Sequence, residues 1–142
     1  MSTDCIFCAI VAGDIPGRIV YEGETITAFL DANPLAPGHV LVVPSDHTER
    51  LNDLANDTVS EFYETVHDLV PATEKAVDAP ATTVAVNNGD AAGQEVPHVH
   101  CHVVPRFAND DGGPIHAVFG DRPDLSDAEL DDVADNIRDA RS

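Results

Sequence analysis

Residues 97–104 read PHVHCHVV, and three histidines in this stretch alternate with apolar side chains or a cysteine. Because successive side chains of a β-strand point to opposite faces, His98, His100 and His102 are expected to share one face. The residues between them would face the other side and could pack against a helix; they are Val99, Cys101 and Val103. The pattern therefore predicts a strand from His98 to Val104 that is closed by the next proline.

Apolar stretches on the N-terminal side of this segment predict the rest of a sheet. The expected strands are Arg18–Glu22, Thr25–Leu30, His39–Val43 and Thr82–Val86. The Gly-Glu pair between the first two predicts a hairpin turn. Consecutive short strands with one long helix inserted among them are typical of an α+β fold, here with an antiparallel sheet of about five strands.

Two helices are expected beside this sheet. A short helix would cover Ile6–Ala12 and end at Gly13, a residue that readily adopts the left-handed conformation of a helix end. A long helix would be capped by Asn56 or Asp57 and would carry one apolar stripe. Pro71 would either kink this long helix or end it.

The chain has 142 residues, a length that favours one domain. We expect residues 1–142 to form that domain, with a core of about residues 5–106 and a C-terminal extension of residues 107–142. In the extension, Ser126 and Glu129 have the spacing of a capping box, which predicts a third, very acidic helix.

The chain is strongly acidic, with 26 Asp plus Glu against 7 Lys plus Arg and a formal net charge of −19. Such a charge repels nucleic-acid backbones and anionic membranes, so neither is expected as a partner. An acidic disordered chain is one interpretation, but the 43% hydrophobic content favours a folded protein with a halophile surface. The absence of a long apolar run and of a basic N-terminal start predicts a soluble, cytoplasmic protein.

Three interpretations compete for the histidines at positions 98, 100 and 102. They could form a solvent-facing polar row, although Ser, Thr or Lys would serve equally well there. They could all bind a catalytic zinc ion, but neighbours on one strand face do not converge easily on a tetrahedral centre. The interpretation we favour is nucleophilic catalysis, because imidazole attacks well when neutral and donates hydrogen bonds when protonated.

The stretch HVHCHVV resembles the signature of the histidine triad (HIT) family. Residues 87–97, NNGDAAGQEVP, resemble the loop that enters this strand in the family. Residues 5–47, which begin CIFCAIVAGD and end GHVLVVPSDH, are similar to the N-terminal half of the family. The resemblance covers Cys5 to about Arg106 and implies the HIT fold, an adenine nucleotide or nucleotide conjugate as the bound partner, and a homodimer.

The resemblance also implies roles for individual residues. His100 would attack the α-phosphorus to form a nucleotidyl-histidine that water then hydrolyses, while His102 would contact phosphate oxygens and His39 would orient the catalytic group. Asp31 would accept hydrogen bonds from the ribose hydroxyls. The loop residues expected near phosphate or ribose are Asn87, Gly93, Gln94 and Glu95, and those expected to form the apolar slot for the base are Ile6, Phe7, Ile10, Phe29 and Leu41.

Most of these residues also have a simpler interpretation. Without the resemblance, Asn87, Gly89 and Gly93 would be ordinary turn chemistry and the apolar set ordinary core, while Asp31 could equally be one more surface acid. Glu95 is a departure, because it stands where some family members have Ser or Thr in contact with phosphate. An ionised carboxylate cannot donate a hydrogen bond, so only its backbone N–H could serve in that way.

Cys5 and Cys8 have the Cys-x2-Cys spacing of zinc ligands, and a tetrahedral site needs two more. The resemblance to some prokaryotic family members supplies His47 and His98 as the other two ligands. Zinc there would be structural, would tie the N-terminal helix to the histidine strand, and would remove His98 from the chemistry. The alternative is a pair of buried thiols without a metal.

The sequence thus predicts a nucleotide hydrolase or transferase that acts on either nucleoside phosphoramidates or dinucleoside polyphosphates. A non-catalytic, zinc-stabilised module that binds purine nucleotides is the first alternative, and a metallohydrolase with the triad as ligands is the second. Substitution His100→Ala separates the first two hypotheses, because it should abolish turnover while nucleotide binding survives.

Overall fold

The computed structural model describes residues 5–141, and its contacts divide the chain into two units, the first ending at Asp110 and the second beginning at Asp111. The elements of the first unit are α1 (Ile6–Ala12), β1 (Ile19–Glu22), β2 (Ile26–Leu30), β3 (Val40–Pro44), the 3₁₀ turn Leu51–Asp53, α2 (Asn56–Val77), β4 (Ala81–Val86), the 3₁₀ turn Asp90–Ala92 and β5 (Cys101–Arg106). Their order confirms the predicted α+β class.

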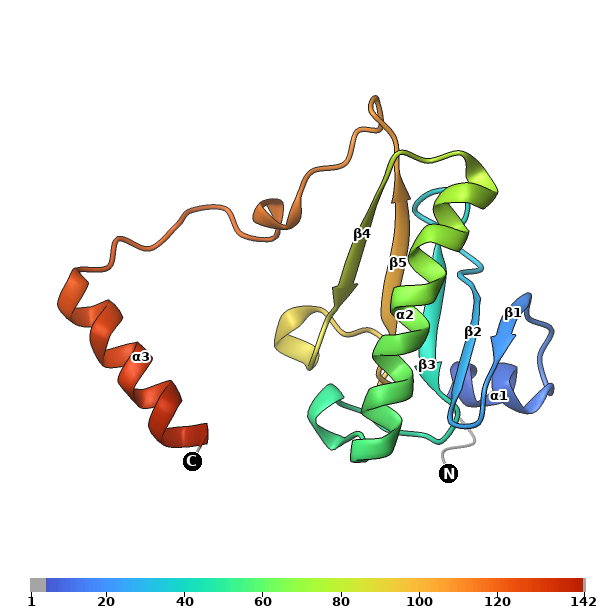
Figure 1. Cartoon of the computed structure of the whole chain (residues 1–142), viewed down its shortest axis with the longest axis horizontal. Coiled ribbons are helices and arrows are strands. Elements are labelled where there is room, and N and C mark those ends of the chain that lie inside the picture. The colour runs from blue at the N-terminus through green and yellow to red at the C-terminus, as the bar shows by residue number, and fades with distance from the viewer. Residues whose placement is uncertain (1–4, 142) are drawn as a thin grey trace. The chain divides into compact units, whose positions relative to one another are not determined.

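The five strands form one antiparallel sheet in the order β1-β2-β3-β5-β4. Helix α2 lies across one face of this sheet (Figure 1). Its Phe62 and Val66 are buried in a core cluster to which the central strands contribute Ile26, Ala28, Val40, Val42, Cys101 and Val103. Val99 belongs to the same cluster, so the residues between the histidines do pack against a helix as predicted.

Helix α1 covers part of the opposite face. Phe29 and Leu41 alternate with the residues that face α2, and they are buried instead with Phe7 and Ile10 of α1. His102 is the register partner of Leu41, which places its side chain on this same face. The α1 helix has the predicted bounds and ends at Gly13, whose φ of 83° is left-handed.

Strand β5 begins at Cys101, three residues later than predicted. The backbone N–H of Val99 donates to the Thr48 carbonyl at 2.7 Å, so the chain reaches the sheet only after this contact with another loop. Pro105 lies within β5 rather than after it. Its missing N–H costs little, because β3 pairs only with the first part of β5 and leaves that edge free at the proline.

The start of α2 also differs from the prediction. Ala55 is the N-cap residue and makes no side-chain cap hydrogen bond, so the expected cap by Asn56 or Asp57 is wrong. Pro71 lies inside the helix, which continues to Val77. Packing against the sheet on both sides of the proline, including buried Val66, offsets the one backbone hydrogen bond that it removes.

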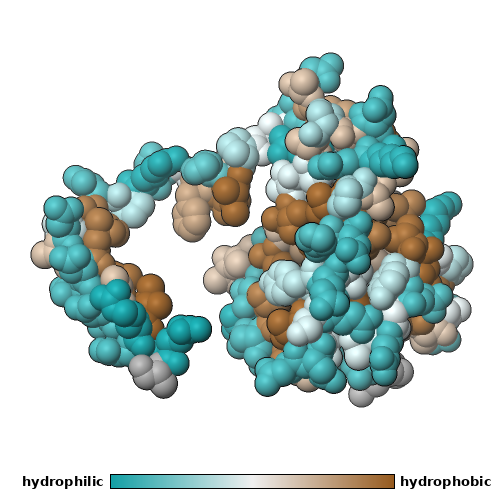
Figure 2. Space-filling view, viewed as in Figure 1, coloured by the Kyte–Doolittle hydropathy of each residue, from teal (hydrophilic) through white to brown (hydrophobic). Residues whose placement is uncertain are grey.

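The second unit contains the 3₁₀ turn Ile115–Val118 and helix α3 (Asp127–Arg141). The predicted capping box is present: the Glu129 N–H donates to Ser126 Oγ, and the Ser126 N–H donates to Glu129 Oε1, both at 3.1 Å. Apolar side chains lie at the surface of this unit (Figure 2), among them Phe119, Leu130, Val133 and Ile137. In the described part of the chain, no helix is both long and apolar enough to cross a membrane.

Candidate active site and metal site

A cavity of about 810 Å³ lies on the face of the sheet that carries α1. All five residues expected to form an apolar slot line it, namely Ile6, Phe7, Ile10, Phe29 and Leu41. The polar residues of the wall include His39, His100, His102, Asp31, Asn87, Gly93 and Glu95. The fold therefore gathers every predicted catalytic and substrate-binding residue except Gln94 around one cavity.

His100 is held in a fixed orientation at this wall. Its Nδ1 lies 2.8 Å from the carbonyl oxygen of His98, and because a carbonyl only accepts, Nδ1 carries the proton and donates. The Nε2 atom therefore keeps its lone pair. The ring is only 7% exposed and packs edge-to-face on Phe7 at a centroid distance of 5.0 Å, so a substrate reaches it through the cavity.

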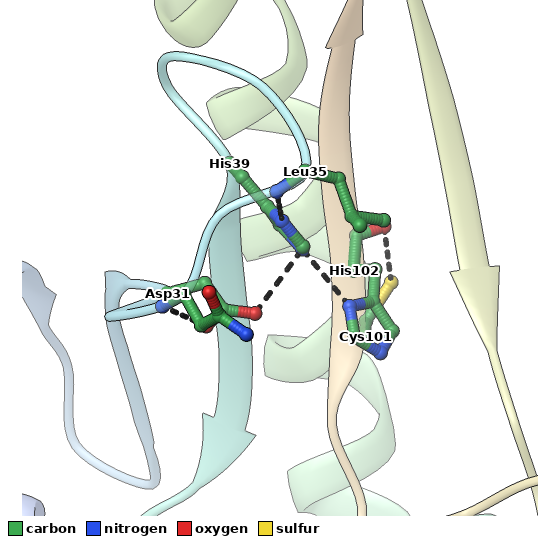
Figure 3. A network of polar contacts seen from close by, with 6 residues as sticks. Asp31, Leu35, His39, Cys101 and His102 are labelled. Atoms are coloured by element: carbon green, nitrogen blue, oxygen red, sulfur yellow. Dashed lines mark hydrogen bonds and ion pairs between the residues drawn. The ribbon is translucent and has the colours of Figure 1, made fainter. Parts of the chain in front are cut away.

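A chain of hydrogen bonds fixes the proton positions on two further histidines. The backbone N–H of Leu35 donates to Nδ1 of His39 at 3.0 Å, so the His39 proton is on Nε2. His39 Nε2 lies 2.9 Å from Nδ1 of His102 and donates to it (Figure 3). His102 therefore carries its own proton on Nε2. Within this series of hydrogen bonds, that nitrogen is the one left to donate to a bound molecule.

Burial keeps these two histidines uncharged. Loss of solvent lowers the pKa of His39. The same cause, with the neighbouring His100 and His39 rings, lowers the pKa of His102 to about 4. The two rings are therefore neutral at neutral pH, as the hydrogen-bond pattern requires.

Asp31 stands on the other side of His39 from His102 (Figure 3). Its Oδ2 lies 3.7 Å from His39 Nε2, and its Oδ1 accepts a hydrogen bond from the backbone N–H of Asn33 at 2.9 Å. The carboxylate lines the cavity and is 22% exposed, so it retains acceptor capacity for a ligand. This placement suits the predicted contact with ribose hydroxyls.

The side chain of Gln94 makes hydrogen bonds that hold together the loop before the histidine segment. Its Oε1 accepts from the Gly89 N–H at 2.8 Å, while its Nε2 donates to the carbonyl oxygens of Glu49 and Val96 at 2.7 and 3.0 Å. The side chain is buried and is not part of the cavity wall. Gln94 thus holds the loop that presents its neighbours, whereas we had expected it to contact phosphate directly.

Among the lining residues that were not predicted from the sequence to belong to the site, Leu35 and Arg18 bear on the chemistry of the cavity. Leu35 acts through a backbone N–H, for which no side-chain signal exists. Arg18 lines the cavity and is exposed. The signal that could have drawn attention to it is scarcity, because the chain has only 7 Lys plus Arg.

The four predicted zinc ligands come together in a second cluster. The donor atoms of Cys5, Cys8, His47 and His98 all lie within 4.8 Å of one another. His98 Nδ1 is 3.3 Å from Cys5 Sγ and 3.5 Å from Cys8 Sγ, and His47 Nδ1 is 3.3 Å from Cys8 Sγ. Tetrahedral zinc with ordinary bond lengths would place neighbouring sulfur and nitrogen ligands about 3.5 Å apart, so this donor set fits that metal.

His98 has the tautomer that a metal ligand needs. Its Nε2 lies 2.8 Å from the Pro44 carbonyl oxygen and donates to it, which leaves the Nδ1 lone pair directed at the two thiols. The side chain is fully buried. No metal-competent group among residues 5–141 contains all three triad histidines, which removes support for a zinc ion bound by the triad itself.

Comparison with known proteins identifies the family. A model described as the HIT domain matches residues 12–109. The chain belongs to the HIT family. An uncharacterised HIT-like protein of Methanocaldococcus jannaschii is 40% identical over 134 residues, which cover 94% of this chain and 98% of that protein.

Two further relatives carry names that describe an activity. The adenosine 5′-monophosphoramidase of Schizosaccharomyces pombe is 38% identical over 72% of this chain and 74% of its own length. The adenylylsulfatase HINT3 of Arabidopsis thaliana is 36% identical over 78% of this chain and 56% of its own length.

Solved structures show the same fold. A protein of Streptococcus mutans superposes with a TM-score of 0.88 at 34% identity, and the match covers 100% of this chain and 88% of that one. A zinc-bound histidine triad family protein of Mycobacterium smegmatis has a TM-score of 0.74 at 38% identity, covering 87% of this chain and 86% of its own.

Proposed function

We propose that this HIT protein is a hydrolase that cleaves the bond between the α-phosphorus of an adenine-type nucleotide and its leaving group. The observation that carries the proposal is the pair of ring nitrogens at the cavity wall. His100 presents a lone pair on Nε2, and the relay through His39 leaves His102 with a donor N–H on the same wall. A nucleophile beside an oxyanion donor is the arrangement that acyl or phosphoryl transfer requires.

In the first step, the Nε2 lone pair of His100 forms a bond to the α-phosphorus, and the bond from phosphorus to the leaving group breaks. The leaving group departs with the bonding electron pair and takes up a proton from solvent, which the water of the second step gives back. His100 keeps its Nδ1 proton, and the His98 carbonyl oxygen stabilises the positive charge that develops on the ring. The His102 N–H stabilises the negative charge on the phosphoryl oxygens.

In the second step, water attacks the phosphorus of the nucleotidyl-histidine. The new P–O bond replaces the P–N bond, the water releases a proton to solvent, the nucleoside monophosphate leaves, and His100 regains its lone pair. The two-step route divides one difficult displacement into two easier ones. The Nε2 proton of the neutral His102 ring stays available to the phosphoryl oxygens in both steps.

Other features of the cavity favour a nucleotide as the substrate. Apolar side chains from α1, β2 and β3 form one part of its wall, as stacking of a base requires. Asp31 offers a fixed carboxylate that could accept hydrogen bonds from two ribose hydroxyls. The names adenosine 5′-monophosphoramidase and adenylylsulfatase among the relatives support an adenylyl group over other nucleotides.

We further propose that Cys5, Cys8, His47 and His98 hold a structural zinc ion, in line with the zinc-bound relative. All four positions would be filled by protein, so the ion would have no open position for water and would stabilise the fold without acting on the substrate. The cluster joins α1, which lines the base slot, to the residue that orients His100.

The decisive experiment is detection of the covalent intermediate. The protein is mixed briefly with an adenosine phosphoramidate, quenched with base and analysed by mass spectrometry, and the modified peptide is sequenced. We expect an adenylyl adduct on His100 that is stable in base and labile in acid. The His100→Ala variant should form no adduct and should lose about 10⁴-fold or more in turnover while it still binds adenosine monophosphate.

An adduct on another residue would contradict the nucleophile. A wild-type protein that binds adenosine monophosphate but cleaves neither phosphoramidates nor dinucleoside polyphosphates would support a binding module instead.

A further inference from the structure

Charge is unevenly distributed around the cavity. Among the described residues that line the cavity, Arg18 is the only one with a cationic Lys or Arg side chain. The two with carboxylate side chains are Asp31 and Glu95. Arg18 follows Gly17, where an added Cβ would lie 2.6 Å from Cγ2 of Ile10, so this segment rests against α1 and the apolar slot. The positive charge therefore belongs to the end of the cavity that suits the base.

Glu95 lines the same cavity from a different segment of the chain. It lies in the loop with Asn87 and Gly93, which line the cavity close in sequence to the nucleophile His100. Its side chain is exposed and has no hydrogen-bond or ion-pair partner within residues 5–141. The other acid of the wall, Asp31, is by contrast engaged by a backbone N–H and lies near His39.

The position of the leaving group follows from the other contacts. If the base occupies the apolar slot and the ribose lies on Asp31, the phosphoryl group comes to His100, and the leaving group extends beyond it. Among the residues of the wall that these contacts leave over, Glu95 is the one with a carboxylate side chain. The neutral rings of His39 and His102 supply no positive charge to this part of the cavity.

We propose that Glu95 is a specificity-determining residue that selects substrates whose leaving group is an amine bearing a second, positively charged ammonium group. This inference rests on the proposed function and narrows it to cationic nucleoside phosphoramidates. A free carboxylate attracts such an ammonium group and repels the additional phosphates of a dinucleoside polyphosphate. The net charge of −19 on the chain acts in the same direction at longer range.

The chemistry of the step remains balanced with such a substrate. His100 Nε2 bonds to phosphorus, the P–N bond breaks with its electron pair on the departing nitrogen, and this nitrogen takes up a proton from solvent and leaves as a neutral amine that still bears the distal ammonium group. Glu95 takes no part in bond making; it holds the distal ammonium group. Replacement of the carboxylate should therefore change the choice among substrates more than the rate for a neutral one.

The test uses three adenosine 5′-phosphoramidates of matched length, whose amines are 4-aminobutyl, pentyl and 4-carboxybutyl groups. In wild type, kcat/KM for the cationic compound should exceed that for the neutral one by about tenfold, and the anionic one should be the poorest. Glu95→Gln should bring the first ratio close to one, and Glu95→Lys should favour the anionic compound. Glu22→Gln, at an exposed position outside the cavity wall, is the matched control and should behave as wild type.

Ionic strength gives an independent readout. The wild-type preference should shrink between about 0.1 and 1 M salt, where the screening length falls from about 10 to 3 Å, and Glu95→Gln should show no such change. Turnover of all three compounds with ratios that Glu95→Gln leaves unaltered overturns the role of Glu95 but not the proposed hydrolase. Failure of wild type to cleave any of them, while it cleaves a dinucleoside polyphosphate, overturns the role of Glu95 alone; failure to cleave either class removes both proposals.

Discussion

The first unit contains two clusters that include histidines and whose donor atoms each lie within 4.8 Å of one another, and they differ in residue type, burial and hydrogen bonding. The cluster of Cys5, Cys8, His47 and His98 is largely buried, and its four donor atoms converge on one point. The cluster of Asp31, His39 and His102 lines a cavity, and its protons form a directed chain. Lone pairs that converge favour a metal ion, whereas an N–H at the end of a chain favours an anionic substrate.

His98 connects the two clusters. Its ring belongs to the metal cluster through Nδ1, while its backbone carbonyl oxygen accepts the proton of His100 Nδ1. Phe7 strengthens this connection, because its ring contacts both His98 and His100 at centroid distances of 5.9 and 5.0 Å. The proposed zinc ion would therefore fix the position of the His100 ring without contacting the substrate.

The largest expected effect is on stability, and it comes from the metal cluster. Cys8→Ser should lower the free energy of unfolding by about 3 kcal/mol or more, because three ligands no longer close a tetrahedral zinc site. Denaturant unfolding and zinc content measured by atomic emission provide the test. His100→Ala, which removes one hydrogen bond and no ligand, should lower stability by only about 1 kcal/mol.

The control variant is Cys101→Ala, which removes a buried cysteine outside the metal cluster, in the core beneath α2. Chelation should lower the unfolding temperature of wild type and of Cys101→Ala, but not that of Cys8→Ser. If chelation leaves wild type unaffected and the purified protein holds no zinc, the cluster is a thiol-histidine core without a metal.

The two clusters also differ in how far the sequence predicted them. Prediction of the metal cluster required only the Cys-x2-Cys spacing and the two histidines that the resemblance supplies. The structure brings all four side chains together. The division of the sheet residues between its two faces was likewise predictable, because alternation places Phe29 and Leu41 on the face opposite Ala28 and Val42.

Features that depend on backbone contacts between distant segments were not predictable. The delayed start of β5 results from the hydrogen bond of Val99 to Thr48, and the proton position on His39 results from the N–H of Leu35. Gln94 has a polar side chain in a loop that we expected near phosphate, yet its amide is engaged by the Glu49 and Val96 carbonyl oxygens. Residue type alone does not show which of several acceptors an amide will find.

A smaller effect, on rate rather than stability, is expected from the relay. His102→Ala should lower kcat by about 10²-fold, because it removes the donor to the developing phosphoryl charge. His39→Phe should cost about tenfold, because the donor ring remains but its proton position is no longer fixed. Single-turnover kinetics with an adenosine phosphoramidate measures both.

His67→Ala on the exposed surface of α2 is the histidine control for these variants. The comparison between the clusters would be weakened if His102→Ala reduced stability as strongly as Cys8→Ser, because that result would make the relay a structural element.

A further expected effect is a dependence of stability on pH. The pKa of His102 is lowered to about 4 by burial and by the neighbouring His100 and His39, while Asp31 acts in the opposite direction. An unfolded histidine titrates near 6.5. Between about pH 6.5 and 4 the unfolded chain takes up a proton at this position that the folded chain does not, so stability falls as the pH is lowered through this window.

Denaturant midpoints measured at intervals from pH 7 to 4.5 test this dependence, with zinc in excess so that the metal cluster stays closed. Other groups titrate in the same range, so the informative quantity is the difference between wild type and His102→Asn at each pH. Wild type should lose stability more steeply, because the variant lacks the site that only the unfolded chain can protonate. Parallel curves would mean that His102 accepts a proton within the folded cavity, and a charged ring there could not receive the His39 hydrogen bond that fixes its donor nitrogen.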